Sequence, residues 1–463
     1  MKKIVYALCA LGLAFAGCKE EKVIEPGPQN PQIIALYDGE FLRNGDVLAA
    51  DVADLPLTIS STVPNVDVAT YEWKIDGTVD EDATTGKFEF DSERTGTFPV
   101  SLSVISKQGK KSSLDFTVEI EGPYKEGLVI YSGSYAGLAF QSADTYYDDL
   151  MSKVVGDSGS GTVQDIYLED NVIYFLLSNG KIVACDAQTF NKLDEYGTFS
   201  GIATPYRLIK AAEGKFYIST DNMGRDKQGL WVYEKQQDDS WAVSSAPIAG
   251  TELAPASKPI RVGDYILIGA GDDIAVIDPA TDKVVPHDKN GITISTDRKV
   301  TDVLKGNDGY IYAVAYSTKS SVSSSIIKID PVDFSFVDET EMLEGDAQNK
   351  VYQTSYASQS HATASITTDD IFVMGSKGIY KFDCGSKTTS LFASMSFSMW
   401  GGDGAGIDYM QMGADKKNVY VGLTNTMSST IYKLDIATGA KSTLRSNVTG
   451  DASVMSTYQF ADR

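Results

Sequence analysis

Histidine is scarce in this chain of 463 residues. Only His287 and His361 are present, which excludes a metal site built from several histidines and ties any serine triad to one of these two side chains. Basic residues are also in deficit, because 40 lysines and arginines face 63 aspartates and glutamates, for a formal net charge of −23. We therefore expect no nucleic-acid partner, since few groups can neutralise phosphates.

The apolar run at the N-terminus, residues 4–15, is too short to cross a bilayer as a permanent helix. It follows two lysines and precedes Ala16-Gly17-Cys18, which is the order of a secretory signal. The segment resembles the lipobox of bacterial lipoproteins, although Phe15 stands where leucine is usual. This resemblance implies that residues 1–17 are removed and that Cys18 carries a lipid.

The residues that follow the lipid site, Lys19-Glu20-Glu21, resemble the export signal of Bacteroidetes lipoproteins. The resemblance implies a protein held by its N-terminal lipid in the outer membrane and facing the cell exterior. Cys9 leaves with the signal, so only Cys185 and Cys384 remain in the folded part. Each flanks the acid of a similar motif in non-adjacent repeats, and we expect two buried, unreactive thiols without a disulfide.

The segment before the repeats divides into a tether and one small domain. Residues 18–32 contain three prolines and should form an extended, flexible tether. Short alternating strands broken by Gly, Pro, Asn and Asp fill residues 33–122, which suits one β-sandwich. Residues 71–77 and 95–98 resemble a central strand and a later turn of polycystic-kidney-disease (PKD) domains. The resemblance implies an immunoglobulin-like sandwich with Trp73 in its core.

Internal repetition governs residues 127–463. Six segments share an apolar strand that ends in an acid and a turn, and a weaker first copy has Gln141 in place of the acid. The six acids are Asp186, Glu234, Asp278, Asp330, Asp383 and Asp435. Successive copies lie 44 to 53 residues apart, the length of a four-stranded propeller blade. Seven copies predict a seven-bladed β-propeller, and the motif resembles the repeats of quinoprotein and surface-layer propellers.

The two ends of the repeat region complement each other. The first copy lacks the strand that precedes each later copy, whereas residues 454–462 form a strand without a repeat of its own. We expect this C-terminal strand to become the innermost strand of the first blade, which would close the ring. The repeated acids are expected to bond backbone N–H groups of their own turns and to play a structural part.

Candidate binding residues come from the loops between blades, which are the longest and most irregular segments. Loops on a rigid scaffold often carry function, and aromatic rings beside small polar groups suit sugar rings or peptide side chains. The residues selected as ligand-binding are Tyr206, Arg207, Arg298, Tyr356, His361, Trp400, Asp403 and Tyr409.

No catalytic constellation is visible in the sequence. A propeller glycosidase needs two carboxylates across a pocket. The loop acids that offer candidates are Asp157, Asp297, Asp403, Asp408 and Asp451. We therefore predict a protein that is not an enzyme and holds neither metal nor cofactor, with a surface glycosidase or polysaccharide lyase as one alternative and a pure protein-docking module as another.

The whole layout of lipobox, PKD-like domain and propeller resembles the PKD-like lipoproteins of Bacteroidetes. Proteins of that layout accompany SusC/SusD-like nutrient-uptake systems. The resemblance implies that this protein binds or presents a glycan or a peptide beside such a transporter.

Overall fold

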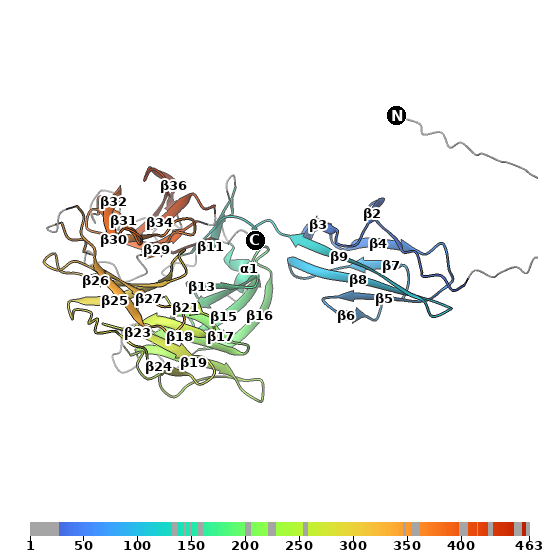
Figure 1. The fold of residues 1–463 in the computed structure, drawn as a ribbon, viewed down its shortest axis with the longest axis horizontal. Helices are drawn as coiled ribbons and strands as arrows, with labels where there is room; N and C mark the ends of the chain where they lie inside the picture. The colour runs from blue at the N-terminus through green and yellow to red at the C-terminus, as the bar shows by residue number, and fades with distance from the viewer. Residues whose placement is uncertain are drawn as a thin grey trace, which may run out of the picture. The chain divides into compact units, whose positions relative to one another are not determined.

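The computed structural model of the protein is built almost entirely from β-strands (Figure 1). The residues that it describes are 27–131, 138–142, 145–147, 150–155, 161–199, 205–220, 228–252, 258–345, 349–352, 362–397, 406–413, 415–424, 429–448 and 456–459. The signal segment and Cys18 lie outside these residues. Within them, helix is confined to η1 (Val52–Asp54) and α1 (Met151–Val155), and neither could span a bilayer.

The described chain divides into two compact units. The first holds the residues up to Glu93 together with Thr97–Glu119, and the second holds Arg94–Gly96 and the residues from Ile120 onward. One sheet of the first unit has the order β2 (Glu40–Leu42), β1 (Ile34–Tyr37), β4 (Leu57–Thr62) and β7 (Lys87–Phe90). The other has the order β3 (Val47–Asp51), β9 (Lys111–Glu121), β8 (Gly96–Ser106), β5 (Val68–Ile75) and β6 (Thr78–Asp80).

The core of the first unit lies between these two sheets. Buried and exposed residues alternate along β4, as expected for a strand with one face against a core. Trp73 of β5 stacks on Phe88 of β7 at a centroid distance of 4.5 Å, so the two sheets face each other. The indole N–H of Trp73 donates to the backbone carbonyl of Thr85 at 3.0 Å. The predicted core position of Trp73 is confirmed.

The described residues of the second unit form seven four-stranded antiparallel sheets, whose colours run from cyan to red in Figure 1. The first has the order β12 (Tyr146–Tyr147), β11 (Leu138–Gln141), β10 (Leu128–Tyr131) and β37 (Ser456–Gln459). The second contains β13 (Val163–Glu169), β14 (Val172–Leu177), β15 (Lys181–Asp186) and β16 (Lys192–Thr198). The third contains β17 (Pro205–Ala212), β18 (Lys215–Thr220), β19 (Gly229–Lys235) and β20 (Trp241–Val243).

The other four sheets repeat this simple order. The fourth contains β21 (Ile260–Val262), β22 (Tyr265–Gly269), β23 (Ile274–Asp278) and β24 (Lys283–Val285). The fifth contains β25 (Arg298–Lys305), β26 (Ile311–Ser317), β27 (Ser325–Ile329) and β28 (Phe336–Glu341). The sixth contains β29 (Ala362–Ala364), β30 (Asp370–Gly375), β31 (Gly378–Asp383) and β32 (Thr388–Ser394). The seventh contains β33 (Gly406–Met412), β34 (Asn418–Thr424), β35 (Ser429–Asp435) and β36 (Lys441–Val448).

Hydrophobic packing joins each of these sheets to the next. Successive pairs share buried clusters, because the side chains of a strand alternate between its two faces. Ile266 of β22 packs toward the third sheet and Leu267 toward the fifth. A last cluster combines Leu128 and Ile130 of the first sheet with Tyr420 and Ile431 of the seventh. The series of sheets therefore returns to its start, although none of the described sheets closes on itself.

The C-terminal strand belongs to the first sheet. β37 pairs antiparallel with β10, with Tyr458 opposite Val129 and Gln459 opposite Leu128. This is the partner that the sequence predicts for the C-terminal strand. The pairing joins the two ends of the repeat region in one ladder, and it gives the first sheet the same four strands as the others.

The repeated acids shape the turns after the third strands. The carboxylate of Asp186 accepts from the backbone N–H groups of Gln188 and Thr189, and Asp435 does the same with Ala437 and Thr438. The corresponding bonds of Asp278 and Asp330 also reach the residue two positions on. The carboxylate of Asp383 accepts from the backbone N–H of Ser386. The predicted structural part is therefore confirmed for the five aspartates, while for Glu234 it stays a prediction.

The two cysteines in the described part of the chain are not bridged. Cys185 is buried and Cys384 is partly buried. Burial raises the pKa of the Cys185 thiol to about 12 and that of the Cys384 thiol to about 11. Both thiols stay protonated near neutral pH, and because the thiolate is the reactive form we expect both to be unreactive.

Candidate functional site

Four of the seven sheets carry a β-irregularity at the same place, near the start of the first strand. The register shifts just before Asp165 in β13, Arg207 in β17, Asp302 in β25 and Tyr409 in β33. Such bulges redirect side chains and are frequent beside functional sites. All four residues that follow the shift are polar and buried. Equivalent positions of four sheets therefore present polar groups in the interior.

Three of these residues, Asp165, Arg207 and Tyr409, belong to a cluster of five polar residues. We call it the central cluster, and its members are Tyr131, Asp165, Arg207, Lys258 and Tyr409. Asp165 is its hub. One carboxylate oxygen, Oδ1, lies 3.4 Å from Arg207 Nη1, 3.8 Å from Lys258 Nζ and 3.5 Å from the Tyr131 hydroxyl. The other, Oδ2, accepts from the backbone N–H of Leu208 at 2.9 Å. The carboxylate thus joins the first, second and third sheets.

The central cluster brings together residues from sheets that do not pack directly on each other. Lys258 lies two residues before the start of β21 in the fourth sheet, and its Nζ lies 5.7 Å from the ring centroid of Tyr409 in the seventh sheet. Among the described residues these two sheets share no hydrophobic cluster, because the fourth packs on the third and fifth and the seventh packs on the sixth and first. A contact between two sheets that are not neighbours places Lys258 and Tyr409 near the centre of the cyclic arrangement of sheets.

Arg207 is the most unusual member of the central cluster. Its side chain is only 1 % exposed, and among the described residues its Nε and Nη2 atoms have no hydrogen-bond partner. Its guanidinium carbon lies 4.8 Å from the ring centroid of Tyr206. Burial opposes the charge of Arg207, but Asp165 together with Tyr206, Tyr131 and Tyr409 holds the Arg207 pKa above its ordinary value. The buried side chain is therefore a cation with two unused donors.

The remaining members set the charge balance of the central cluster. Burial and, after it, Asp165 raise the pKa of the Tyr131 phenol well above its ordinary value, so Tyr131 is neutral. The cluster then combines one carboxylate with two basic side chains. Such a site favours a ligand that brings one negative charge and hydrogen-bond acceptors.

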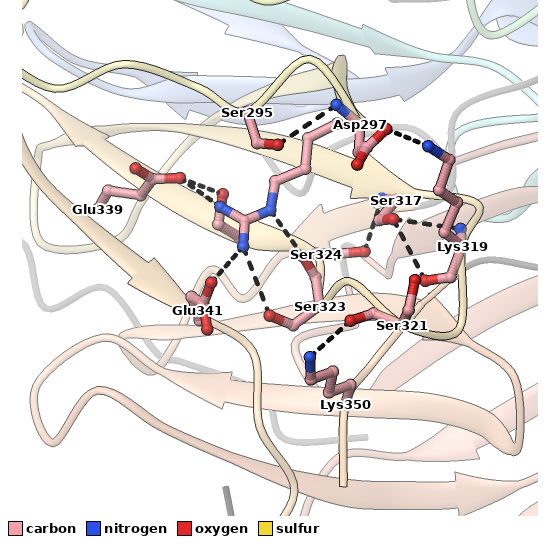
Figure 2. Close-up of polar contacts among 12 residues, drawn as sticks. Ser295, Asp297, Ser317, Lys319, Ser321, Ser323, Ser324, Glu339, Glu341 and Lys350 are labelled. Atoms are coloured by element: carbon pink, nitrogen blue, oxygen red, sulfur yellow. Dashed lines mark hydrogen bonds and ion pairs between the residues drawn. The ribbon is translucent and has the colours of Figure 1, made fainter. Parts of the chain in front are cut away.

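Arg298 occupies a different environment at the start of β25. Its Nε donates to the Ser323 carbonyl at 2.6 Å, its Nη1 to Glu339 at 2.8 Å and its Nη2 to Glu341 at 2.5 Å. Figure 2 shows three residues that accept from this guanidinium, Glu339, Glu341 and Ser323, gathered around one point. Ser325 also donates to Glu339, at 2.7 Å. All three guanidinium nitrogens are thus used inside the fifth sheet.

More than half of the chain, residues 140–409, matches the model of one protein family, the "Domain of unknown function (DUF5074)". The chain belongs to the DUF5074 family. No curated protein matches it. Among solved structures, this DUF5074 chain is similar to a quinoprotein alcohol dehydrogenase-like protein from Bacteroides thetaiotaomicron, with 16 % identity, 94 % of this chain and 99 % of that chain covered, and a TM-score of 0.50.

A second solved structure, of a protein from Lactobacillus plantarum, is 16 % identical, with 72 % of the DUF5074 chain and 99 % of that chain covered and a TM-score of 0.49. The structural neighbours of the DUF5074 chain have quinoprotein-like β-propeller folds. At these identities the likeness is one of fold alone.

Three of the residues selected from the sequence meet in or beside the central cluster, namely Tyr206, Arg207 and Tyr409. Arg298 does not join them, and its contacts give its selection as a ligand residue no support. The other selected residues lie outside the described residues of the DUF5074 chain: Tyr356, His361, Trp400 and Asp403. The loop acids Asp157 and Asp451 lie outside them as well, and Asp297 pairs with Lys319.

Sequence reasoning missed Tyr131, Asp165 and Lys258. Asp165 stands in the segment QDIYLED, two residues after the start of a first strand, as Arg207 does in PYRLIK. Alignment of the first strands of the DUF5074 chain would have shown that this position is polar in several copies. In the described residues, no group of three or more His, Cys, Asp and Glu side chains could hold a metal ion.

Proposed function

We propose that this protein binds a ligand at the central cluster without transforming it. One observation carries the proposal: buried charged groups from separate sheets converge on one point, and the Arg207 guanidinium there keeps two donors that have no partner in the described part of the chain. Buried charges are normally paired, and exceptions cluster at functional sites. The single carboxylate among the members of the cluster favours binding over glycoside hydrolysis, which needs two.

We also propose that the scaffold of this site is a seven-bladed propeller closed by β37, which a PKD-like sandwich precedes in the chain. The cyclic packing of seven four-stranded sheets and the pairing of β37 with β10 support the ring. The stacked core around Trp73 supports the sandwich. A closed ring gives the central cluster rigid walls on every side, which suits capture of a ligand.

The biological setting rests on the sequence resemblance. A lipid on Cys18 would hold the protein in the outer membrane and facing the cell exterior, where it would bind or present a glycan or a peptide for a SusC/SusD-like uptake system. The alternatives are a surface glycosidase or polysaccharide lyase and a protein-docking module.

Binding measurements on the purified chain separate these functions. A panel of glycans and peptides is titrated into the wild type and into Asp165→Asn and Lys258→Met, with Lys319→Met as the control outside the cluster. We expect saturable binding without products, weakened about tenfold or more in the two cluster variants and unchanged in the control. Release of products would favour the enzyme, and neither binding nor products would favour the docking module.

A further inference from the structure

The free edge of Arg207 has a defined shape. Asp165 lies at Nη1, whereas the atoms without a partner among the residues that the structure describes are Nε and Nη2. In a planar guanidinium, Nε and one terminal nitrogen share an edge and present parallel N–H groups whose spacing matches the two oxygens of a carboxylate. The neutral phenol of Tyr131 and the amine of Lys258 surround Asp165 and do not supply such an acceptor.

We propose that the central cluster recognises an acidic sugar, a uronic acid whose carboxylate accepts two hydrogen bonds from Nε and Nη2 of Arg207. This inference rests on the proposed function and names the class of its ligand. One carboxylate from the ligand balances the excess of basic side chains in the cluster. It also supplies acceptors to two donors that have no partner among the described residues.

The composition of the central cluster favours a sugar over a peptide. Each of its members carries a polar group that can form a hydrogen bond with a sugar hydroxyl. The ring of Tyr206, at 4.8 Å from the guanidinium carbon, provides a flat face beside the anion site that suits the C–H groups of a sugar ring. Asp165 and Lys258 can accept from and donate to sugar hydroxyls.

The first test uses the wild-type chain and matched probes. Trigalacturonic acid, its methyl ester and neutral trigalactose are titrated calorimetrically, because the ester keeps the sugar and removes only the charge of the carboxylate. We expect the acid to bind about 10- to 100-fold more tightly than the ester or the neutral sugar. Equal affinities of acid and ester would overturn the inference while leaving the proposed function standing.

The second test uses three arginine variants. Arg207→Gln is expected to abolish the preference for the acid, and Arg207→Lys to retain only part of it, because lysine keeps the charge and loses the paired donors. Arg445→Gln, in β36 and over the ring of Tyr146, serves as the control and should behave as wild type. Thermal melting checks that each variant folds, and the wild-type comparison stands if one does not.

A peptide arm separates the sources of a carboxylate. Trialanine and its C-terminal amide are titrated in the same way. If trialanine bound and neither its amide nor the sugar acid did, the assignment of a sugar would be overturned. The proposed function of ligand binding would still stand. Failure of every glycan and peptide to bind would instead overturn the proposed function itself.

Discussion

Two arginines near the starts of first strands show how differently a buried cation can be used. Arg207 in β17 and Arg298 in β25 are 1 % and 6 % exposed. Arg298 meets two glutamates of its own sheet and a backbone carbonyl in the segment between β26 and β27. Arg207 meets one carboxylate of the neighbouring sheet, and two of its nitrogens have no partner within the described ranges. Burial alone therefore does not distinguish a structural arginine from a binding one, but its hydrogen-bond partners do.

Both arginines depend on the cyclic packing of the seven sheets for their surroundings. Removal of the C-terminal strand should disturb this packing more than any single substitution. Deletion of residues 456–463 should lower the free energy of unfolding of the second unit by about 3 kcal/mol or more, since β10 loses a ladder of hydrogen bonds and gains an open edge. Urea denaturation measures this loss. Deletion of residues 461–463 alone is the control, and an unchanged midpoint after the longer deletion would show that β37 is dispensable.

Methionine substitutions test the two arginines directly. Arg298→Met should cost about 2–3 kcal/mol, because Glu339 and the Ser323 carbonyl lose their partner in a mostly buried place. Arg207→Met should cost less than Arg298→Met, because Asp165 keeps Lys258 and the backbone N–H of Leu208 as partners. Urea denaturation compares them. An Arg207→Met loss as large as that of Arg298→Met would make Arg207 structural.

The fold could be predicted from the sequence because the strands and turns of each repeat are determined by residues within that repeat. The third strands end in an acid whose turn is closed by local hydrogen bonds, so Asp186 or Asp435 can be interpreted without knowing its distant neighbours. The C-terminal strand was predictable for a similar reason, since the first repeat lacked one strand.

The site was only partly predictable because it depends on distant pairs. Loop position selected Arg207 and Arg298 alike, and their difference lies in whether Glu339 or Asp165 faces the guanidinium. Lys258 and Tyr409 lie in sheets that are not neighbours, and no local pattern brings them together. Register shifts within the first strands, which turn Asp165 inward, leave no signature in composition.

Alkaline titration asks whether the central cluster shields its groups as well as the fifth sheet does. Burial and Asp165 raise the pKa of Tyr131 above 10.0, its ordinary value, so above that pH unfolding releases a proton and the free energy of unfolding falls as pH rises. Tyr131→Phe should remove about 1.4 kcal/mol of this loss per pH unit above about pH 10. Tyr316→Phe, whose phenol is shielded by burial near Asp302, is the matched variant.

Denaturation of both variants at about pH 9 and about pH 11 measures these slopes. A wild-type slope in Tyr131→Phe together with a shallower slope in Tyr316→Phe would mean that the phenol of the central cluster ionises in the folded protein. The central cluster would then be open to water. The difference between Arg207 and Arg298 would in that case be one of exposure to water and not one of hydrogen-bond partners.

The smallest effect is expected from the exposed ion pair beside Arg298. Lys319 pairs with Asp297 in the same close-up, but the two side chains are 57 % and 37 % exposed (Figure 2). Water screens such pairs, so Lys319→Met should change the free energy of unfolding by less than about 0.5 kcal/mol. A loss of stability equal to that of Arg298→Met would contradict this prediction. The exposed pair of Lys319 and Asp297 would then stabilise this region as much as the buried guanidinium of Arg298 does.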